Sequence, residues 1–262
     1  MKVRDLLKIL EELTSEPCIK TYEEELNNAL VFGNEDDVVK GIVIVWKPTI
    51  NIIKKAVELK ANVIISHESL FYEYKPYLTK GRNIFTIPAN LKKIELLTKY
   101  KINVIRYHTK WDDAENGNND TLLKLLDLEL IEKYPCMRIA KLKKPLRAID
   151  FAKLVKERLK SPYVKFVGNK EKLIERVLII AGAGAKNISF LDFALQKRCD
   201  AIVSGDSIAD TQYFSYENDL VLIDPGHQYL EQWGMKSLAE ILEKKLNVPV
   251  YFIENENVVS VL

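Results

Sequence analysis

The sequence contains few of the residues and patterns that define several large classes of protein. Its three cysteines, Cys18, Cys136 and Cys199, lie far apart and show neither metal-ligand spacing nor a disulfide framework. No segment approaches the ~20 consecutive apolar residues of a membrane helix. Residues 1–13 are amphipathic and include acids, unlike a signal peptide. We therefore expect a cytoplasmic protein with reduced, buried thiols and no membrane partner.

An excess of charge of one sign is also missing. Lys and Arg number 39 against 37 Asp and Glu, which gives a formal net charge of +2. Basic and acidic side chains are interleaved at 92–95 and 240–245, a pattern typical of solvated helix faces. Because no basic patch is present, we expect no nucleic-acid partner.

Strand and helix patterns alternate along most of the chain, which predicts an α/β fold. Expected strands are 41–46, 62–66, 102–107, 138–142, 163–167, 177–180, 201–203, 220–223 and 250–253. Expected helices are 3–13, 48–57, 91–100, 149–159, 188–196, 210–216 and 237–246. We predict two similar α/β lobes with mixed, mostly parallel sheets, at 1–132 and 133–262, with a metal site in the cleft between them. The C-terminal segment is allowed to pack back on the first lobe.

An internal repeat links the two halves. The segments 63–68 and 201–206 each place a carboxylate two residues after a serine that ends a strand. One helix and one strand later, 108–112 and 227–231 each read His-x-x-x-carboxylate. Two copies of one β-α-β unit would place polar groups at the carboxyl ends of strands, where sites form in open α/β sheets.

The only histidines of the chain are His67, His108 and His227, and each follows a predicted strand. Each also has a carboxylate one or four residues later. Imidazole and carboxylate together suit divalent transition metals, and carboxylates can bridge two ions. A metal-free acid–base pair needs only one His and one acid and leaves the duplication unexplained. We therefore predict a metal site with His67, Glu68, Asp112, His227 and Glu231 as ligands.

Two further patterns are weaker. The glycine-rich segment 181–187 lacks the ending and spacing of a P-loop, so we favour a tight turn that brings backbone toward the site over a phosphate cradle. Ser66 and Ser204 end strands, but no order of Ser, His and acid indicates a serine nucleophile.

These motifs together resemble the Nif-three-like family of GTP cyclohydrolase 1 type 2 homologues. The motifs that carry the resemblance are Ile-Ser-His-Glu-Ser-Leu-Phe (65–71), His-Thr-Lys-Trp-Asp (108–112), Gly-Asn-Asn-Asp (117–120) and Gly-His with Glu231 (226–231). The resemblance implies metal ligands at His67, Asp112, His227 and Glu231, and a homo-hexameric ring. Glu68 stands where the family has a second adjacent His, Trp46 where it has Asp, and Tyr213 where it has His. Glu68 favours Mn, Fe or Mg over Zn, or indicates the loss of one of two ions.

From the site and the resemblance we expect a metal-dependent hydrolase of a nucleotide-like or phosphorylated small molecule, using two divalent ions (Mn, Fe, Zn or Mg). A divalent ion lowers the pKa of water toward neutrality, which suits it to generate the nucleophile. His108 is then the catalytic proton shuttle, or it orients a ligand. The alternative is a non-catalytic metal-binding scaffold or metal-handling protein, which the departures at Trp46, Glu68 and Tyr213 favour.

Overall fold

The chain is divided into two compact units. A computed structural model describes residues 1–14, 29–73 and 83–260, so Cys18 lies outside the described residues. The first unit comprises residues 1–111 and 235–257, and the second comprises 112–234 with the residues after 257. The first two crossings between the units fall inside helices, α6 (Thr109–Asp113) and α11 (His227–Lys245).

A five-stranded, mostly parallel sheet forms the centre of the first unit. Its strands are β1 (Leu30–Phe32), β2 (Ile42–Val45), β3 (Val63–Ser66), β4 (Asn103–Arg106) and β11 (Val250–Phe252). Their order is β1-β4-β3-β2-β11, and only β1 runs antiparallel to its neighbour. The last strand of the chain therefore completes the sheet built from the first 111 residues.

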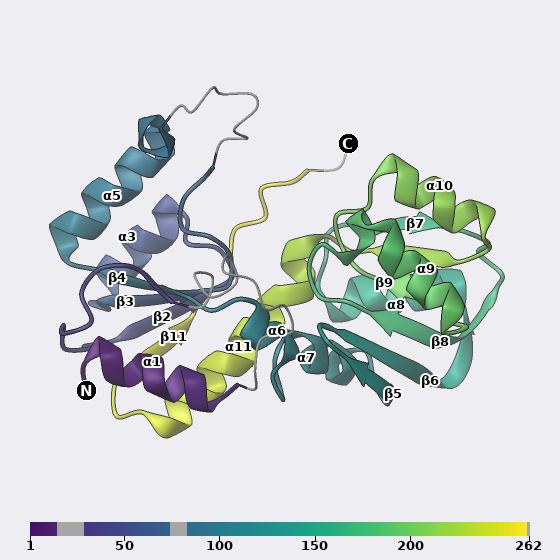
Figure 1. The fold of residues 1–262 in the computed structure, drawn as a ribbon, viewed down its shortest axis with the longest axis horizontal. Coiled ribbons are helices and arrows are strands. Elements are labelled where there is room, and N and C mark those ends of the chain that lie inside the picture. The colour runs from purple at the N-terminus through teal and green to yellow at the C-terminus, as the bar shows by residue number, and fades with distance from the viewer. Residues whose placement is uncertain (15–28, 74–82, 261–262) are drawn as a thin grey trace. The chain divides into compact units, whose positions relative to one another are not determined.

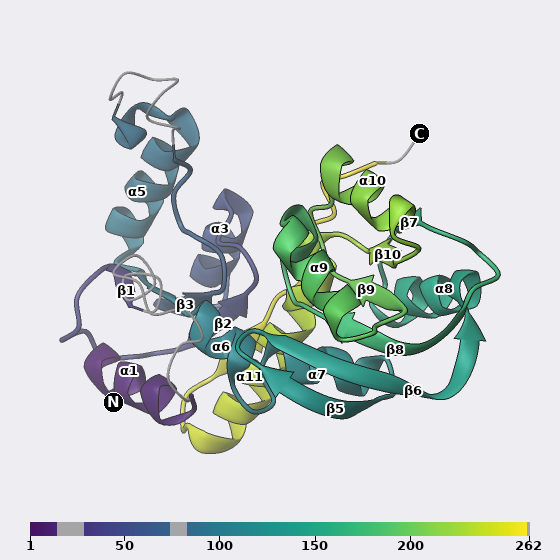
Figure 2. The same ribbon diagram turned by 45° about the vertical axis from the view of Figure 1, so that its right-hand side comes forward.

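Helices cover both faces of this sheet (Figure 1). They are α1 (Val3–Glu12), α3 (Ile50–Glu58), the 3-10 turn η1 (Ile84–Thr86), α5 (Pro88–Tyr100) and the second half of α11. Val43 and Ile64 belong to the apolar cluster that packs on α3 and α5. Ile42 and Ile65 have the opposite parity and are also buried, on the face where both ribbon views show α1 and α11 (Figures 1 and 2). Burial on both faces explains the continuous β-branched runs of these strands.

The second unit contains a six-stranded sheet in the order β5-β6-β8-β9-β10-β7. Its strands are β5 (Leu128–Tyr134), β6 (Met137–Arg147), β7 (Lys165–Val167), β8 (Leu173–Ile179), β9 (Ala201–Val203) and β10 (Val221–Asp224). Its helices are α7 (Asn118–Leu125), α8 (Ala148–Arg158), the 3-10 turn η2 (Gly184–Lys186), α9 (Ile188–Gln196), α10 (Ala209–Glu217) and the first half of α11. The central strands β8, β9 and β10 are parallel, and the outer strands are antiparallel.

Alternate residues of this sheet pack into two separate clusters. Val177 and Val203 face α7, α8 and α11, whereas Leu178 and Ile202 face α9, with α10 packed at the edge. Figure 2 shows the same division, with α9 and α10 on one face and α8 on the other. The structure thus confirms the expected α/β class with mixed, mostly parallel sheets.

Several elements differ from the sequence-based expectations. Strands β1 and β5 and helix α7 were not expected, because β1 is only three residues long and the mixed polar and apolar residues of β5 and α7 show no clear period. Helix α11 begins at His227, ten residues before the predicted helix at 237. Cys136 is disulfide-bonded, against the expectation of reduced thiols, whereas Cys199 is a free, buried thiol. None of the helices in the described residues is long and apolar enough to cross a membrane.

A buried arginine fastens the segment between α6 and α7 to the second sheet. Arg138 on β6 is fully buried, and its guanidinium contacts Asp113 at 2.8 Å and Asp120 at 2.7 Å. It also donates to the carbonyl oxygen of Asp113 at 3.2 Å. Because Asp113 directly follows Asp112, this network positions one of the predicted metal ligands.

We expect Arg138→Met to destabilise the chain by about 3–5 kcal/mol, since it leaves Asp113 and Asp120 without their buried counter-charge. Lys141→Met on the same strand is the matched control, because Lys141 and Glu129 pair at 3.2 Å in solvent and such pairs contribute about 0–1 kcal/mol. Urea unfolding of both variants measures the difference. Equal losses in the two variants would contradict this role for Arg138.

Candidate metal-binding site

Polar side chains follow the carboxyl ends of neighbouring parallel strands in both units. In the first unit, His67 follows β3 and His108 follows β4 at one residue's distance, and β3 pairs with β4 in parallel. In the second, Asp206 follows β9 and His227 follows β10, which are also parallel neighbours. The sequence repeat therefore corresponds to two equivalent strand-end positions, where α/β sheets form ligand sites.

His67 is fully buried and has a defined tautomer. Its Nδ1 lies 3.2 Å from the carbonyl oxygen of Tyr107. A carbonyl only accepts hydrogen bonds, so Nδ1 carries the proton and Nε2 presents a lone pair. This arrangement is typical of metal-ligating histidines, whose second nitrogen donates to a carbonyl or carboxylate.

His108 lies beside His67 in the first unit. The two imidazole rings have centroids 4.6 Å apart and are tilted by 41°. Asp112 is on α6, one turn after His108 in the sequence, and it is the first residue of the second unit. Asn118 donates to Asp112 Oδ1 at 2.7 Å, which fixes the buried carboxylate. Each unit thus contains donors suited to a divalent ion.

Glu68 belongs to the first unit and sits directly after His67. Its backbone N–H donates to the carbonyl oxygen of Trp46 at 2.8 Å. Its carboxylate lies 3.9 Å from Lys47 Nζ, and both side chains are partly exposed. The Glu68 carboxylate therefore has an ammonium group beside it.

In the second unit, His227 connects two carboxylates. Its Nδ1 lies 3.0 Å from Asp206 Oδ2, and its Nε2 lies 2.9 Å from Glu231 Oε2. Glu231 follows one turn later on α11 and is only 2% exposed. The hydrogen bond from His227 lowers the pKa of the Asp206 carboxyl below its usual range.

The His227–Glu231 pair fits a divalent cation. Since Asp206 accepts the Nδ1 proton, the lone pair on Nε2 faces a carboxylate oxygen at 2.9 Å unless a proton or a cation lies between them. Two neighbouring ligands of an octahedral ion with bonds of about 2.1 Å lie about 3.0 Å apart. The separation therefore matches that of two ligands on one ion, and the nitrogen and oxygen donors suit Mn, Fe, Zn or Mg.

The glycine-rich segment brings backbone against this pair. Gly182 has φ +76°, and a Cβ at this position would lie 2.2 Å from Glu231 Oε1 and 3.1 Å from His227 Nε2. Only glycine leaves room for both side chains. The expected tight turn toward the site is thus present.

The hydrogen bonds of residues 185–187 give the alternative interpretation of this segment, a phosphate cradle, no support. The backbone N–H of Ala185 donates to Ser204 Oγ and to the carbonyl oxygen of Gly205, each at 3.1 Å. Those of Lys186 and Asn187 donate to carbonyl oxygens of the turn itself. Because these donors are already used by the protein, they do not form an anion-binding nest.

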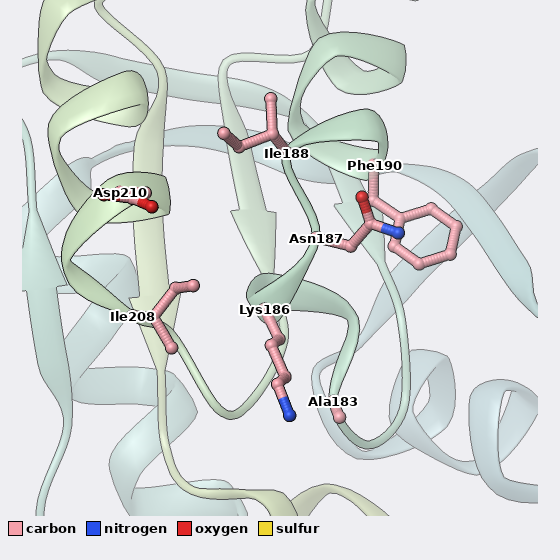
Figure 3. A pocket seen from close by; sticks show the side chains of 7 residues that line it. All are labelled: Ala183, Lys186, Asn187, Ile188, Phe190, Ile208 and Asp210. Atoms are coloured by element: carbon pink, nitrogen blue, oxygen red, sulfur yellow. The ribbon is translucent and has the colours of Figure 1, made fainter. Parts of the chain in front are cut away.

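A pocket of about 610 Å³ opens beside the turn (Figure 3). Ala183, the neighbour of Gly182, lines it together with Lys186 and Asp210. Its apolar lining includes Ile188 and Ile208, each 42% exposed. A small molecule with an apolar part has space here, next to the turn that contacts His227 and Glu231.

Two supporting residues were missed at the sequence level. Asp224 ends β10 and accepts hydrogen bonds from Ser207 Oγ at 2.7 Å and from the Gly226 N–H at 2.9 Å. It thereby joins the loop after Asp206 to the start of α11. Asp224 could have been predicted from the sequence because it is a carboxylate at the end of an apolar strand. Asp206 could have been predicted as a site residue from the strand-end repeat. Tyr213, at the family's His position, is 70% exposed on α10.

Several known proteins are similar to this chain over most of its length. A protein named GTP cyclohydrolase 1 type 2 homolog from Clostridium perfringens is 26% identical over 97% of this chain and 95% of its own length. One of the same name from Haemophilus influenzae is 28% identical, over 79% of this chain and 80% of its own. The crystal structure of Staphylococcus aureus protein SA1388 has the same fold, with a TM-score of 0.84 at 22% identity, and the match covers 100% of this chain and 99% of that one. The profile of the Duf34/NIF3 (NGG1p interacting factor 3) family matches residues 1–258, and the chain belongs to that family.

Proposed function

We propose that this chain is a metal-dependent hydrolase with a dinuclear site, held by His67, Glu68, Asp112, His227 and Glu231. Its substrate would be a nucleotide-like or phosphorylated small molecule. The observation that carries the proposal is the 2.9 Å approach of His227 Nε2 to the buried Glu231 carboxylate. A nitrogen and a carboxylate oxygen at this separation can serve as two ligands of one divalent cation, whose charge would offset the cost of burying the Glu231 carboxylate.

Three of the five proposed ligands have a partner that orients them within their own unit. The Tyr107 carbonyl orients His67, Asn118 orients Asp112, and Asp206 orients His227. Such partners fix the tautomer and raise the basicity of the ligands. Divalent ions, when bound, supply Lewis acidity and lower the pKa of water.

His108 is the proposed proton shuttle. The ring of His108 lies against that of His67, and His108 is partly exposed. His108 is not among the metal ligands that the family resemblance implies. An imidazole can both accept and donate a proton within one reaction. The pocket beside Gly182 would receive the apolar part of the substrate.

A non-catalytic metal-binding or metal-handling protein is the second candidate. Lys47 favours it, because its ammonium lies 3.9 Å from Glu68 and competes with a metal for that carboxylate. Two finer parts of the proposal are the cytoplasmic location expected from the sequence composition and the homo-hexamer implied by the family resemblance.

Catalysis is tested by turnover with Mn²⁺ on nucleotides and phosphate esters. We expect His108→Gln to lower kcat by about 10²–10⁴-fold, the usual contribution of a general acid–base. Absence of turnover in the metal-loaded wild type over the whole panel would favour the non-catalytic candidate.

The metal site is tested separately by Mn²⁺ titration. We expect Glu231→Ala to weaken Mn²⁺ binding by roughly 100-fold and to remove the rise in Tm that bound metal gives. Glu240→Ala is the matched control, because Glu240 is exposed on the same helix and pairs only with Lys236, at 3.9 Å. If both variants bound Mn²⁺ like the wild type, Glu231 would not be a ligand.

Gly182 offers a test that leaves every ligand in place. We expect Gly182→Ala to weaken Mn²⁺ binding about 10–100-fold, because the added Cβ displaces the Glu231 carboxylate. Gly168→Ala introduces the same methyl group at φ +118° against Val221, on β10, and controls for backbone strain. A loss of affinity that is equal in both variants would show that strain, not contact with Glu231, is responsible.

A further inference from the structure

Lys93 occupies a position that its sequence context does not predict. The alternation of charges at 92–95 indicated a solvated helix face, and Lys92 and Glu95 do pair in solvent at 2.8 Å. The side chain of Lys93 instead lies on the buried face of α5, with only 1% of the residue exposed. Buried lysines are rare unless they are paired.

No carboxylate neutralises this ammonium within the described parts of the chain. Lys93 Nζ donates to the carbonyl oxygen of Leu70 and lies 4.6 Å from the centre of the Tyr72 ring. A second ammonium, that of Lys47, lies 5.6 Å from the centre of the same ring. A buried charge without a counter-ion costs several kcal/mol, so this cluster contains more positive charge than the protein itself compensates.

The two ammonium groups act on one another. Burial and then repulsion by Lys47 lower the pKa of Lys93 to about 8. The lysines are therefore near enough for their charges to interact, and Lys93 remains mostly protonated at pH 7. The interaction favours an anion that both can contact.

The cluster is also rigidly held. Asn90 lies one turn before Lys93 on α5 and both donates to and accepts from the backbone of Tyr72, at 2.8 and 2.9 Å. Asn255 fixes the backbone of Lys47 in the same way, at 2.9 and 2.8 Å. The side chain of Lys47 is 24% exposed, which opens the cluster to solvent.

We propose that Lys47 and Lys93 form a binding site for the phosphoryl group of a phosphorylated ligand, beside the Tyr72 ring. A phosphate monoester carries about −1.5 to −2 charges at pH 7 and three acceptor oxygens, which match two ammonium groups. A monocarboxylate would neutralise only one of them. Lysine binds phosphate as a compact point charge.

This phosphoryl site extends the proposed function. It rests on that function in one respect only, namely that the bound phosphorylated ligand is the substrate. Lys47 lies between the phosphoryl site and Glu68, so a bound phosphoryl group would stand near that proposed metal ligand. Phosphate binding itself needs no metal. Measuring it in chelator therefore separates a failure of this site from a failure of the metal site.

The experiment titrates the full chain with inorganic phosphate and with acetate in chelator, following the Tm and the ³¹P linewidth. We expect phosphate to bind the wild type, and Lys47→Met and Lys93→Met each to weaken it about tenfold or more, the loss of one charge-assisted contact. Lys47→Arg should retain binding. Lys54→Met, which removes an exposed lysine of α3, is the matched control and should leave it unchanged.

Three outcomes would overturn the proposal. An equal rise in Tm with phosphate for the wild type and for both Lys→Met variants would show only the general effect of an excluded salt. An equal response to acetate would show that the site does not select a dianion. If Lys93→Met failed to fold, an unchanged phosphate affinity of Lys47→Met would be sufficient to reject the site.

Discussion

Two features bring the candidate ligands together, namely the parallel pairing of neighbouring strands and a glycine that leaves room beside them. Parallel strands end at one edge of a sheet, so residues after β3 and β4, and after β9 and β10, must converge. Gly182 then lets a turn approach Glu231 and His227 where any side chain would collide. The parallel packing of the strands therefore brings the polar side chains that follow their carboxyl ends close to one another.

Buried charge is compensated in most of the molecule. Arg138 is neutralised by two aspartates, and Asp224 accepts several hydrogen bonds and lies 3.3 Å from Lys165. The His227–Glu231 pair places a buried carboxylate 2.9 Å from an imidazole nitrogen, and Lys93 places a buried ammonium against a carbonyl oxygen and an aromatic ring. A divalent cation bound by His227 and Glu231 would offset negative charge, and a phosphoryl group bound beside Lys93 would offset positive charge.

Helix α11 shows how the site depends on chain order. Its first turn carries His227 and Glu231 in the second unit, and its later residues, such as Leu238, are buried in the first. Strand β11 then pairs with β2, near the other end of the chain. Replacing an exposed residue of this helix, such as Glu240, should leave both units intact.

The sequence by itself determined the α/β class, the central parallel strands and the repeat that marks the strand ends. These follow from periods of two and about four residues, which apolar burial imposes locally. Helix α7 and strands β1 and β5 were not predictable in this way, since contacts with distant segments override their weak local preferences.

The partners of each side chain were decided only by the tertiary structure. The orientation of His67 by a carbonyl 40 residues away, the pairing of Asp206 with His227 and the burial of Lys93 depend on long-range contacts. The pattern of charged residues shows how they are spaced along a helix. It does not show which face of the helix packs against the rest of the protein. Lys93 was therefore expected in solvent, whereas packing of α5 against the segment at 70–72 placed it inside.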